Sequence, residues 1–321
     1  MIVRSADGTS IFFECFRAPN PRGALLVIHG LGEHSGRYAE VVAEAKALRL
    51  DVHLLDLRGH GRSSGTRGHF SSLEELHLDI DAWLKHLVEA GELKASLPCY
   101  LLGHSFGGLV ALTFAARYVP GPTYPPISGL ILSSPLVGVK WNPARALEAQ
   151  VARRTPKFLQ TIHIPTGIKF EDLTHDAEEI ARCRLDPLMH QWITPGGFKG
   201  MERGMASLPK LAAQLNLPML FLVSGQDKIV NPQATLSFAK KCSVASPGKV
   251  EVRVFHNFYH EPFHELKKER AFLELKKWIL RCLPRNTIPL NKSSSKSSAK
   301  KATAKGISRS PRAKKAPSTS T

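Results

Sequence analysis

Residues 103–107 read Gly-His-Ser-Phe-Gly, and this Gly-x-Ser-x-Gly spacing can carry a nucleophilic serine. The pentapeptide follows the apolar run 99–102, which predicts a strand, and precedes a helix-like stretch over 109–118. A strand, a sharp turn and a helix form a nucleophile elbow, which exposes the serine hydroxyl at strained backbone angles. Glycines on both sides allow strand and helix to approach closely because they carry no side chain. We therefore predict Ser105 as a nucleophile, against the alternative of an ordinary serine in a glycine-containing loop.

A serine hydroxyl needs a histidine to take its proton, and that histidine needs a carboxylate to fix its tautomer. In a protein built around such an elbow, the acid and then the histidine follow the serine in the chain. The apolar run 219–223 predicts a buried strand, and Asp227 follows its carboxyl end. The alternating run 250–254 predicts another strand, with three histidines after it: His256, His260 and His264. Asp227 is the predicted acid, whereas spacing alone does not choose among the histidines.

Residues 260–264 also spell His-Glu-x-x-His, the signature of zinc proteases. That signature works on a continuous helix, where two histidines four residues apart share one face and the glutamate reaches a metal-bound water. Pro262 lies between the two histidines, and proline is tolerated only in the first turn of a helix. The zinc interpretation is therefore disfavoured.

Acyl transfer also requires backbone N–H groups directed at the oxygen that becomes negative. One comes from the residue after the nucleophile, and the other from the loop after an earlier strand of the sheet. Residues 24–28 form a fully apolar run that predicts this strand, and His29, Gly30 and Leu31 follow it. Leu31 and Phe106 are the predicted donors of the oxyanion hole.

Five sequence blocks follow one another along the chain: His29-Gly30-Leu31-Gly32-Glu33-His34-Ser35-Gly36-Arg37-Tyr38, Asp56-Leu57-Arg58-Gly59-His60-Gly61-Arg62-Ser63-Ser64-Gly65, Gly103-His104-Ser105-Phe106-Gly107-Gly108, Ser224-Gly225-Gln226-Asp227 and Tyr259-His260. Taken in order, these blocks resemble the monoacylglycerol lipase and lysophospholipase branch of the α/β-hydrolases, which are serine aminopeptidase S33-like hydrolases. The resemblance covers roughly residues 10 to 280.

The resemblance implies that His260 is the base, because the base in that family is the histidine that follows an aromatic residue. It also implies hydrolysis of esters of long-chain acids, with no metal and no organic cofactor. Phe106 occupies a position where the family often has methionine or another residue. A backbone donor is indifferent to that change, although the shape of the pocket is not.

Strand-like and helix-like stretches alternate along most of the chain, which predicts an α/β fold with a mostly parallel sheet flanked by helices. Further strands are expected at 52–57 and 129–132, and a helix at 73–89. Residues 2–17, with Asp-Gly near their middle, predict an antiparallel hairpin at the edge of the sheet. The glycines that follow the strand at 52–57 do not fit the dinucleotide-binding spacing.

The alternation stops after Pro135. We predict an inserted, mainly helical cap at 136–208 within an α/β-hydrolase core formed by 1–135 and 209–284. Helices are expected at 143–153 and 176–184. Apolar residues of this segment could line an acyl pocket or pack inside the cap itself. They are Trp141, Phe158, Leu159, Ile162, Ile164, Ile168, Phe170, Met189 and Trp192.

Residues 285–321 differ from the rest of the chain in composition. They contain ten of the 44 Lys and Arg residues and none of the 27 acidic residues, with almost nothing apolar after Leu290. Such a segment cannot bury enough surface to fold, so it is predicted to be a disordered basic tail. It is compatible with contact to an anionic membrane, with loose nucleic-acid binding, or with a solvated appendage.

No signal peptide and no run of apolar residues long enough to span a membrane is expected. The five cysteines are odd in number and scattered, which suits a reducing cytoplasm. The sequence therefore predicts a cytoplasmic protein, with peripheral membrane association through the tail left open.

The residues together predict a serine hydrolase that cleaves carboxylic esters of lipids, with monoacylglycerol or lysophospholipid as the substrate. A carboxylesterase, a thioesterase or a peptidase of the same fold is an alternative, because fold and triad do not separate these activities. A non-catalytic ligand-binding module is the alternative from another class. It does not require the full set of catalytic elements that this chain carries.

Overall fold

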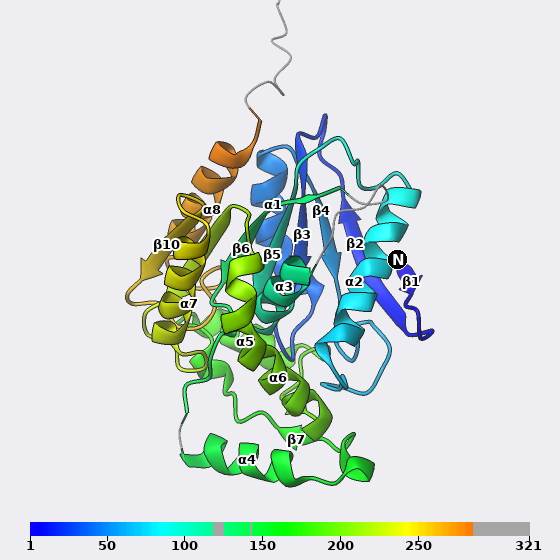
Figure 1. Cartoon of the computed structure of the whole chain (residues 1–321), viewed down its shortest axis with the longest axis vertical. Coiled ribbons are helices and arrows are strands. Elements are labelled where there is room, and N and C mark those ends of the chain that lie inside the picture. The colour runs from blue at the N-terminus through cyan, green and yellow to red at the C-terminus, as the bar shows by residue number, and fades with distance from the viewer. Residues whose placement is uncertain (118–124, 142, 285–321) are drawn as a thin grey trace, which may run out of the picture. The chain divides into compact units, whose positions relative to one another are not determined.

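The computed structural model describes residues 1–117, 125–141 and 143–284 (Figure 1). The predicted basic tail, residues 285–321, lies outside the described residues.

The core is an eight-stranded sheet with the strand order β1-β2-β4-β3-β5-β6-β9-β10. The six strands from β4 to β10 in this order pair in parallel, and β1 and β2 pair antiparallel at one edge. The strands are β1 Ile2–Arg4, β2 Ser10–Phe16, β3 Gly23–Ile28, β4 Leu50–Leu55, β5 Cys99–His104, β6 Ile127–Ser133, β9 Met219–Ser224 and β10 Val250–Phe255.

The inner strands β3, β5, β6 and β9 are mostly apolar because helices cover both faces of the sheet. Every residue of β3, β5 and β9 is buried. The alternating strand β10 lies at the edge and is only partly buried. The expected hairpin forms the other edge, with Gly8 at a positive φ in its turn. Because the parallel strands all run in the same direction, the loops after β3, β5, β9 and β10 come together at the end of the sheet where these strands finish.

Helices α1, α2, α3, α7 and α8 lie in two layers around the sheet, and α4 lies apart from it (Figure 1). Apolar residues of α1 and α8 pack against one face, and those of α2, α3 and α7 pack against the other. The helices are α1 Ala39–Ala47, α2 Leu73–Glu89, α3 Phe106–Arg117, α4 Pro143–Arg154, α5 Ala177–Leu185, α6 Pro195–Leu211, α7 Pro232–Ala245 and α8 Glu269–Cys282.

The segment predicted as an insertion, 136–208, holds α4, α5 and a short antiparallel pair of β7 (Ile164–Pro165) and β8 (Trp192–Ile193). Helix α6 begins in this segment and ends at Leu211, so residue 208 lies within a helix. In Figure 1, α6 lies between α4 and the helices of the sheet.

Helices α6, α7 and α8 are the long elements that the sequence did not predict, and α6 is the one that contributes to the candidate site. It contains four glycines and two prolines, which usually disfavour a helix interior. Its start nevertheless carries a local signal, because Thr194 accepts a hydrogen bond from the N–H of Gly197 and Pro195 occupies the first turn. No helix within the described ranges combines the length and the apolar character needed to cross a bilayer.

Candidate active site

Ser105 lies at the turn between β5 and α3, at the end of the sheet where the parallel strands finish. Its φ is 52°, in the left-handed region that a residue with a side chain rarely adopts. A Cβ on Gly103 would overlap the carbonyl oxygen of Gly107, and a Cβ on Gly107 would overlap the carbonyl oxygen of Ile28. The tight turn therefore requires both glycines of the pentapeptide, and it presents the serine as a nucleophile elbow does.

His260 lies between Ser105 and Asp227. Its Nε2 is 2.8 Å from the Ser105 Oγ, and its Nδ1 is 2.7 Å from the Asp227 Oδ2. The carboxylate can only accept at this distance, so Nδ1 carries a proton and Nε2 presents a lone pair to the hydroxyl. Asp227 is 2% exposed, and its Oδ1 accepts hydrogen bonds from the N–H groups of Ile229 and Val230. The structure thus brings together the three residues that the sequence predicted as a triad.

Burial on its own lowers the pKa of His260, because a buried imidazolium loses its hydration. The charge and hydrogen bond of Asp227 outweigh this effect, with smaller contributions from Glu261 and Glu33. The net result is a pKa raised above the usual value for histidine. An imidazole with a raised pKa is a stronger base toward a serine proton.

The predicted oxyanion donors, Leu31 and Phe106, belong to the loop after β3 and to the first residue of α3. Within the described part of the chain, neither backbone N–H has a hydrogen-bond acceptor. Both residues line the pocket that contains Ser105. The loop after β3 is held by Glu33, which accepts hydrogen bonds from the Gly30 N–H at 2.5 Å and the Tyr38 hydroxyl at 2.8 Å.

The two competing histidines occupy other environments. His256 is exposed in the turn after β10. His264 is partly buried, with Nδ1 3.2 Å from a Glu261 carboxylate oxygen and Nε2 3.0 Å from the Arg37 carbonyl oxygen. Only His260 reaches Ser105, so the geometry makes the same choice as the family resemblance.

The zinc interpretation fails on the backbone conformation. Residues 256–268 form turns, bends and irregular backbone without a helix, and α8 begins only at Glu269. His260 and His264 therefore do not share a helix face, as the His-Glu-x-x-His chemistry requires.

Two clusters among the described residues are close enough to hold a metal, namely Cys15, His53 and Glu92, and Glu179, Glu261 and His264. In each cluster an arginine already pairs with a carboxylate. Arg17 contacts Glu92 at 2.8 Å, and Arg37 contacts Glu179 at 2.8 Å and Glu261 at 2.7 Å. A positive charge therefore already lies where a cation would bind.

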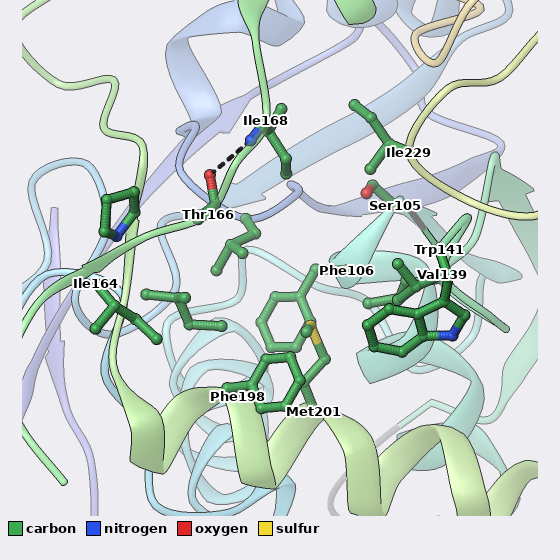
Figure 2. Close-up of a pocket in the computed structure, with 14 residues that line it drawn as sticks. Ser105, Phe106, Val139, Trp141, Ile164, Thr166, Ile168, Phe198, Met201 and Ile229 are labelled. Carbon is green, nitrogen blue, oxygen red and sulfur yellow. Dashed lines mark hydrogen bonds between the residues drawn. The ribbon is translucent and has the colours of Figure 1, made fainter. Parts of the chain in front are cut away.

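A pocket of about 710 Å³ opens beside Ser105, and its lining is almost entirely apolar. In Figure 2, Phe106, Phe198 and Met201 gather beside a helix at one end of this pocket, and Ser105 lies near Ile229. The lining residues are Leu31, Ser105, Phe106, Leu136, Val139, Trp141, Ile164, Pro165, Thr166, Ile168, Ile193, Phe198, Met201 and Ile229. This pocket suits a hydrocarbon chain attached to a carbonyl at Ser105.

A second, more polar pocket of about 460 Å³ shares Ser105 with the first. Its polar lining comes from the active-site loops and from the segment before β8: Glu33, Arg37, His104, Thr166, His190, Gln191, His260 and Glu261. A mostly apolar pocket and a pocket with a mixed polar and apolar lining thus meet at Ser105.

The sequence named several apolar residues of the insertion as candidates for the pocket. Trp141, Ile164 and Ile168 line the apolar pocket, and Phe170 and Met189 line the polar one. The remaining candidates, Phe158, Leu159, Ile162 and Trp192, line neither pocket. The sequence missed Phe198 and Met201 because it missed α6.

Comparison with known proteins gives consistent matches over most of the chain. A family model described as serine aminopeptidase, S33, matches residues 19–267. A monoacylglycerol lipase of Mycolicibacterium smegmatis is 32% identical over 263 residues, which cover 81% of this chain and 89% of the relative. A phospholipase of Bacillus subtilis is 28% identical over 258 residues, covering 80% of this chain and 95% of that protein. The crystal structure of the Paleococcus ferrophilus monoacylglycerol lipase aligns with a TM-score of 0.72 and 28% identity, over 85% of this chain and 99% of that one.

Proposed function

The chain belongs to the serine aminopeptidase, S33, family of hydrolases, and on that premise we propose that it cleaves carboxylic esters of lipids, with monoacylglycerol or lysophospholipid as substrate. Its fold is the α/β-hydrolase fold, as predicted from the sequence. The observation that carries the proposal is the unbroken chain of contacts from Ser105 through His260 to Asp227 beside an apolar pocket.

The proposed reaction begins when the Ser105 oxygen attacks the ester carbonyl carbon and His260 takes the hydroxyl proton at Nε2. The N–H groups of Leu31 and Phe106 bind the oxygen that becomes negative, and Asp227 stabilises the imidazolium. The bond between the carbonyl carbon and the alcohol oxygen breaks, and His260 donates its proton to the departing alcohol. Water then attacks the acyl-serine ester, His260 takes a proton from it, and the fatty acid leaves as the serine hydroxyl is restored.

The two pockets support a substrate with one apolar end and one polar end. The acyl chain would occupy the pocket that Phe198 and Met201 line, because burying a chain there removes apolar surface from water. The alcohol portion would face His190 and Gln191 in the polar pocket. A small polar headgroup such as glycerol fits this division better than a second long chain does.

The segment 136–208 acts as a cap in this proposal. It supplies Trp141, Ile164, Ile168 and Phe198 to the apolar pocket, and Met189 to the polar one. Such a segment shields the acyl-enzyme from bulk water and shapes the pocket for the chain.

The family description also names aminopeptidases, which must bind the ammonium group of a peptide. A free carboxylate near the nucleophile is the usual way to bind an ammonium group. Here the carboxylates of the polar pocket, Glu33 and Glu261, are both paired with Arg37. Peptidase activity is therefore the weaker alternative.

The test is a hydrolysis panel of monoacylglycerols, lysophospholipids, short 4-nitrophenyl esters, an acyl thioester and an aminoacyl 4-nitroanilide. We expect the monoacylglycerols or lysophospholipids to give the highest kcat/KM. Ser105→Ala should lower kcat by about 10⁴- to 10⁶-fold and abolish labelling by a fluorophosphonate, because the nucleophile is lost.

Ser246→Ala is the matched control, because Ser246 is a buried serine at the end of α7 and does not line either pocket. It should keep both turnover and labelling. Labelling that survives in Ser105→Ala would reject the nucleophile, and a preference for the anilide would replace the lipid assignment with a peptidase.

A further inference from the structure

Arg37 lies in the loop after β3 with a side chain only 6% exposed, and it contacts three carboxylates. Nη1 donates to Glu33 at 2.9 Å and to Glu261 at 2.8 Å. Nη2 donates to Glu179 at 2.8 Å and to Glu261 at 2.7 Å. All four N–H groups of the two terminal nitrogens therefore donate hydrogen bonds. Among side chains, only the planar guanidinium presents this many donors in a fixed arrangement.

The first partner, Glu33, connects Arg37 to the proposed oxyanion hole. Its Oε1 accepts the Gly30 N–H, and Gly30 immediately precedes Leu31. Its Oε2 accepts from Arg37. The ion pair thus fixes the carboxylate that holds the backbone next to the oxyanion donor.

The second partner, Glu261, directly follows His260 in the chain. The two Glu261 oxygens accept from different Arg37 nitrogens, which is the strong bidentate geometry. The Glu261 backbone N–H also donates to the Leu173 carbonyl oxygen at 2.9 Å. The backbone next to the base is therefore held from two directions.

The third partner, Glu179, belongs to α5 of the inserted segment. Its carboxylate also accepts from Arg182 at 2.8 Å. A single guanidinium therefore connects three separate segments, namely the loop after β3, the loop after β10 and α5.

His264 is a further titratable group in this cluster. Its two ring nitrogens face a Glu261 carboxylate oxygen and the Arg37 carbonyl oxygen, both of which can only accept. A protonated ring satisfies both contacts. Burial and Arg37 lower the pKa of His264, but the contact with Glu261 outweighs them and raises it.

We propose that Arg37 is a positioning residue. It holds the loop after β3 and the loop after β10 in a fixed position relative to each other, and it links both loops to α5. This inference rests on the proposed function, because the two loops carry Leu31 and His260. Positioning of this kind affects kcat strongly, since a displacement of about 1 Å at a reacting group can cost about 100-fold in rate.

Arg37 also sets the electrostatic balance around the base. The charged and titratable groups that face His260 are Asp227, Glu261, Glu33 and His104, and Arg37 neutralises two of these acids. Burial on its own would raise the pKa of Glu261, but Arg37 outweighs it and holds that pKa well below its usual range. Removal of the Arg37 charge would leave the negative charges of Glu33 and Glu261 beside the base, with the His264 contact to Glu261 to offset them in part.

The experiment compares three variants of the full chain, on a soluble ester that the wild type hydrolyses. Arg37→Lys keeps the charge and loses the planar guanidinium, so kcat should fall about 10- to 100-fold while KM stays within about threefold. The acid limb of the pH profile, where activity falls as His260 becomes protonated, should stay at the wild-type pH. Arg37→Gln should lower kcat at least as much and move the acid limb to higher pH. Glu261→Gln keeps the shape and removes a negative charge, so the limb should move to lower pH.

Arg58→Lys is the matched control. Arg58 is another buried arginine that pairs with three carboxylates, but it does not line either pocket. This variant should lose thermal stability and keep kcat and the acid limb. Circular dichroism verifies folding of each variant, and Glu261→Gln still tests the charge effect if an Arg37 variant does not fold.

Two outcomes would overturn the positioning role. One is an Arg37→Lys enzyme with wild-type kcat. The other is acid limbs of Arg37→Gln and Glu261→Gln that stay at the wild-type pH. A wild-type protein that hydrolyses no ester would instead reject the proposed function, so the two failures are distinct.

Discussion

Ser105 combines a strained backbone with strong local support. Its left-handed φ would be unfavourable for a serine in an isolated peptide. Hydrogen bonds from the Ser105 N–H to Ser133 at 2.9 Å and from the Leu136 N–H to the Ser105 carbonyl at 2.8 Å hold it from the neighbouring strand. Strain of this kind persists only where the surrounding structure enforces it, and it typically marks a functional residue.

The pH dependence of turnover reports directly on His260. A protonated His260 cannot take the serine proton, so kcat/KM should fall as the pH drops through its pKa. Because that pKa is raised, the midpoint of this acid limb should lie above about 6.5 in the wild type. Asp227→Asn should lower kcat by about 10³- to 10⁴-fold and move the limb to lower pH, since the charge that raises the pKa is removed.

The control for this measurement is Asp51→Asn. Asp51 is a buried residue near the start of β4, at the end of the sheet opposite to the site. This variant should leave the position of the acid limb unchanged, even if the protein loses stability. An acid limb that Asp227→Asn does not move would mean that Asp227 is not the partner of the base.

At the scale of elements, α6 explains how the inserted segment is attached to the sheet. Its glycines face neighbouring side chains, with Gly200 against Phe70 and Gly204 against Leu73 and Leu109. Close packing of this face places Phe198 and Met201 in the apolar pocket. The glycines that weaken α6 as an isolated helix therefore permit its packing in the folded protein.

This packing can be tested with Gly204→Val. A Cβ at this position would overlap the Leu73 side chain and lie 3.3 Å from the Leu109 side chain, so the added volume should cost about 1–3 kcal/mol of unfolding free energy. Ala206→Val lies on the exposed face of the same helix and should cost under about 1 kcal/mol. Urea denaturation measures both, and equal losses would mean that the glycine face is not closely packed.

At the scale of the whole molecule, four parallel strands converge on the candidate site. The loop after β3 carries Leu31, β5 leads into Ser105, and the loops after β9 and β10 carry Asp227 and His260. Residues 285–321 carry ten of the 44 Lys and Arg residues and none of the 27 acidic residues, and they lie outside the described residues. These residues therefore contribute +10 of the formal net charge of +17, and none of the residues proposed for chemistry belongs to them.

Deletion of residues 287–321 separates chemistry from location. Because the segment is basic and almost free of apolar residues, kcat/KM on a soluble short-chain ester should stay within about twofold. Association with vesicles of phosphatidylserine and phosphatidylcholine should weaken, because each basic residue near an anionic surface contributes about 1 kcal/mol.

Salt and neutral vesicles provide the controls. Rising salt should erase the difference in binding to anionic vesicles between the full chain and the chain that lacks residues 287–321. Vesicles of pure phosphatidylcholine should show no such difference. Equal binding of both forms at low salt would reject the membrane role. Salt-sensitive retention of the full chain alone on DNA would favour nucleic acid as the partner instead.

The sequence alone determined the features that depend on a few adjacent residues. The Gly-x-Ser-x-Gly turn, the buried strands and the edge hairpin follow from local sterics and hydrophobic periodicity, and the fold class predicted from them is confirmed. Asp227 was predicted as the acid because it follows a buried strand. The choice of His260 needed the family resemblance, since three histidines, His256, His260 and His264, follow β10 within nine residues.

Tertiary structure alone decided which distant side chains meet. Ser105 and His260 are 155 residues apart, and Arg37 and Glu261 are 224 apart, so their contacts depend on strand order and register throughout the sheet. The same holds for α6, whose glycine face is stable only against Phe70 and Leu73. Local propensity cannot encode such contacts, because their free energy arises from surfaces that only the folded chain brings together.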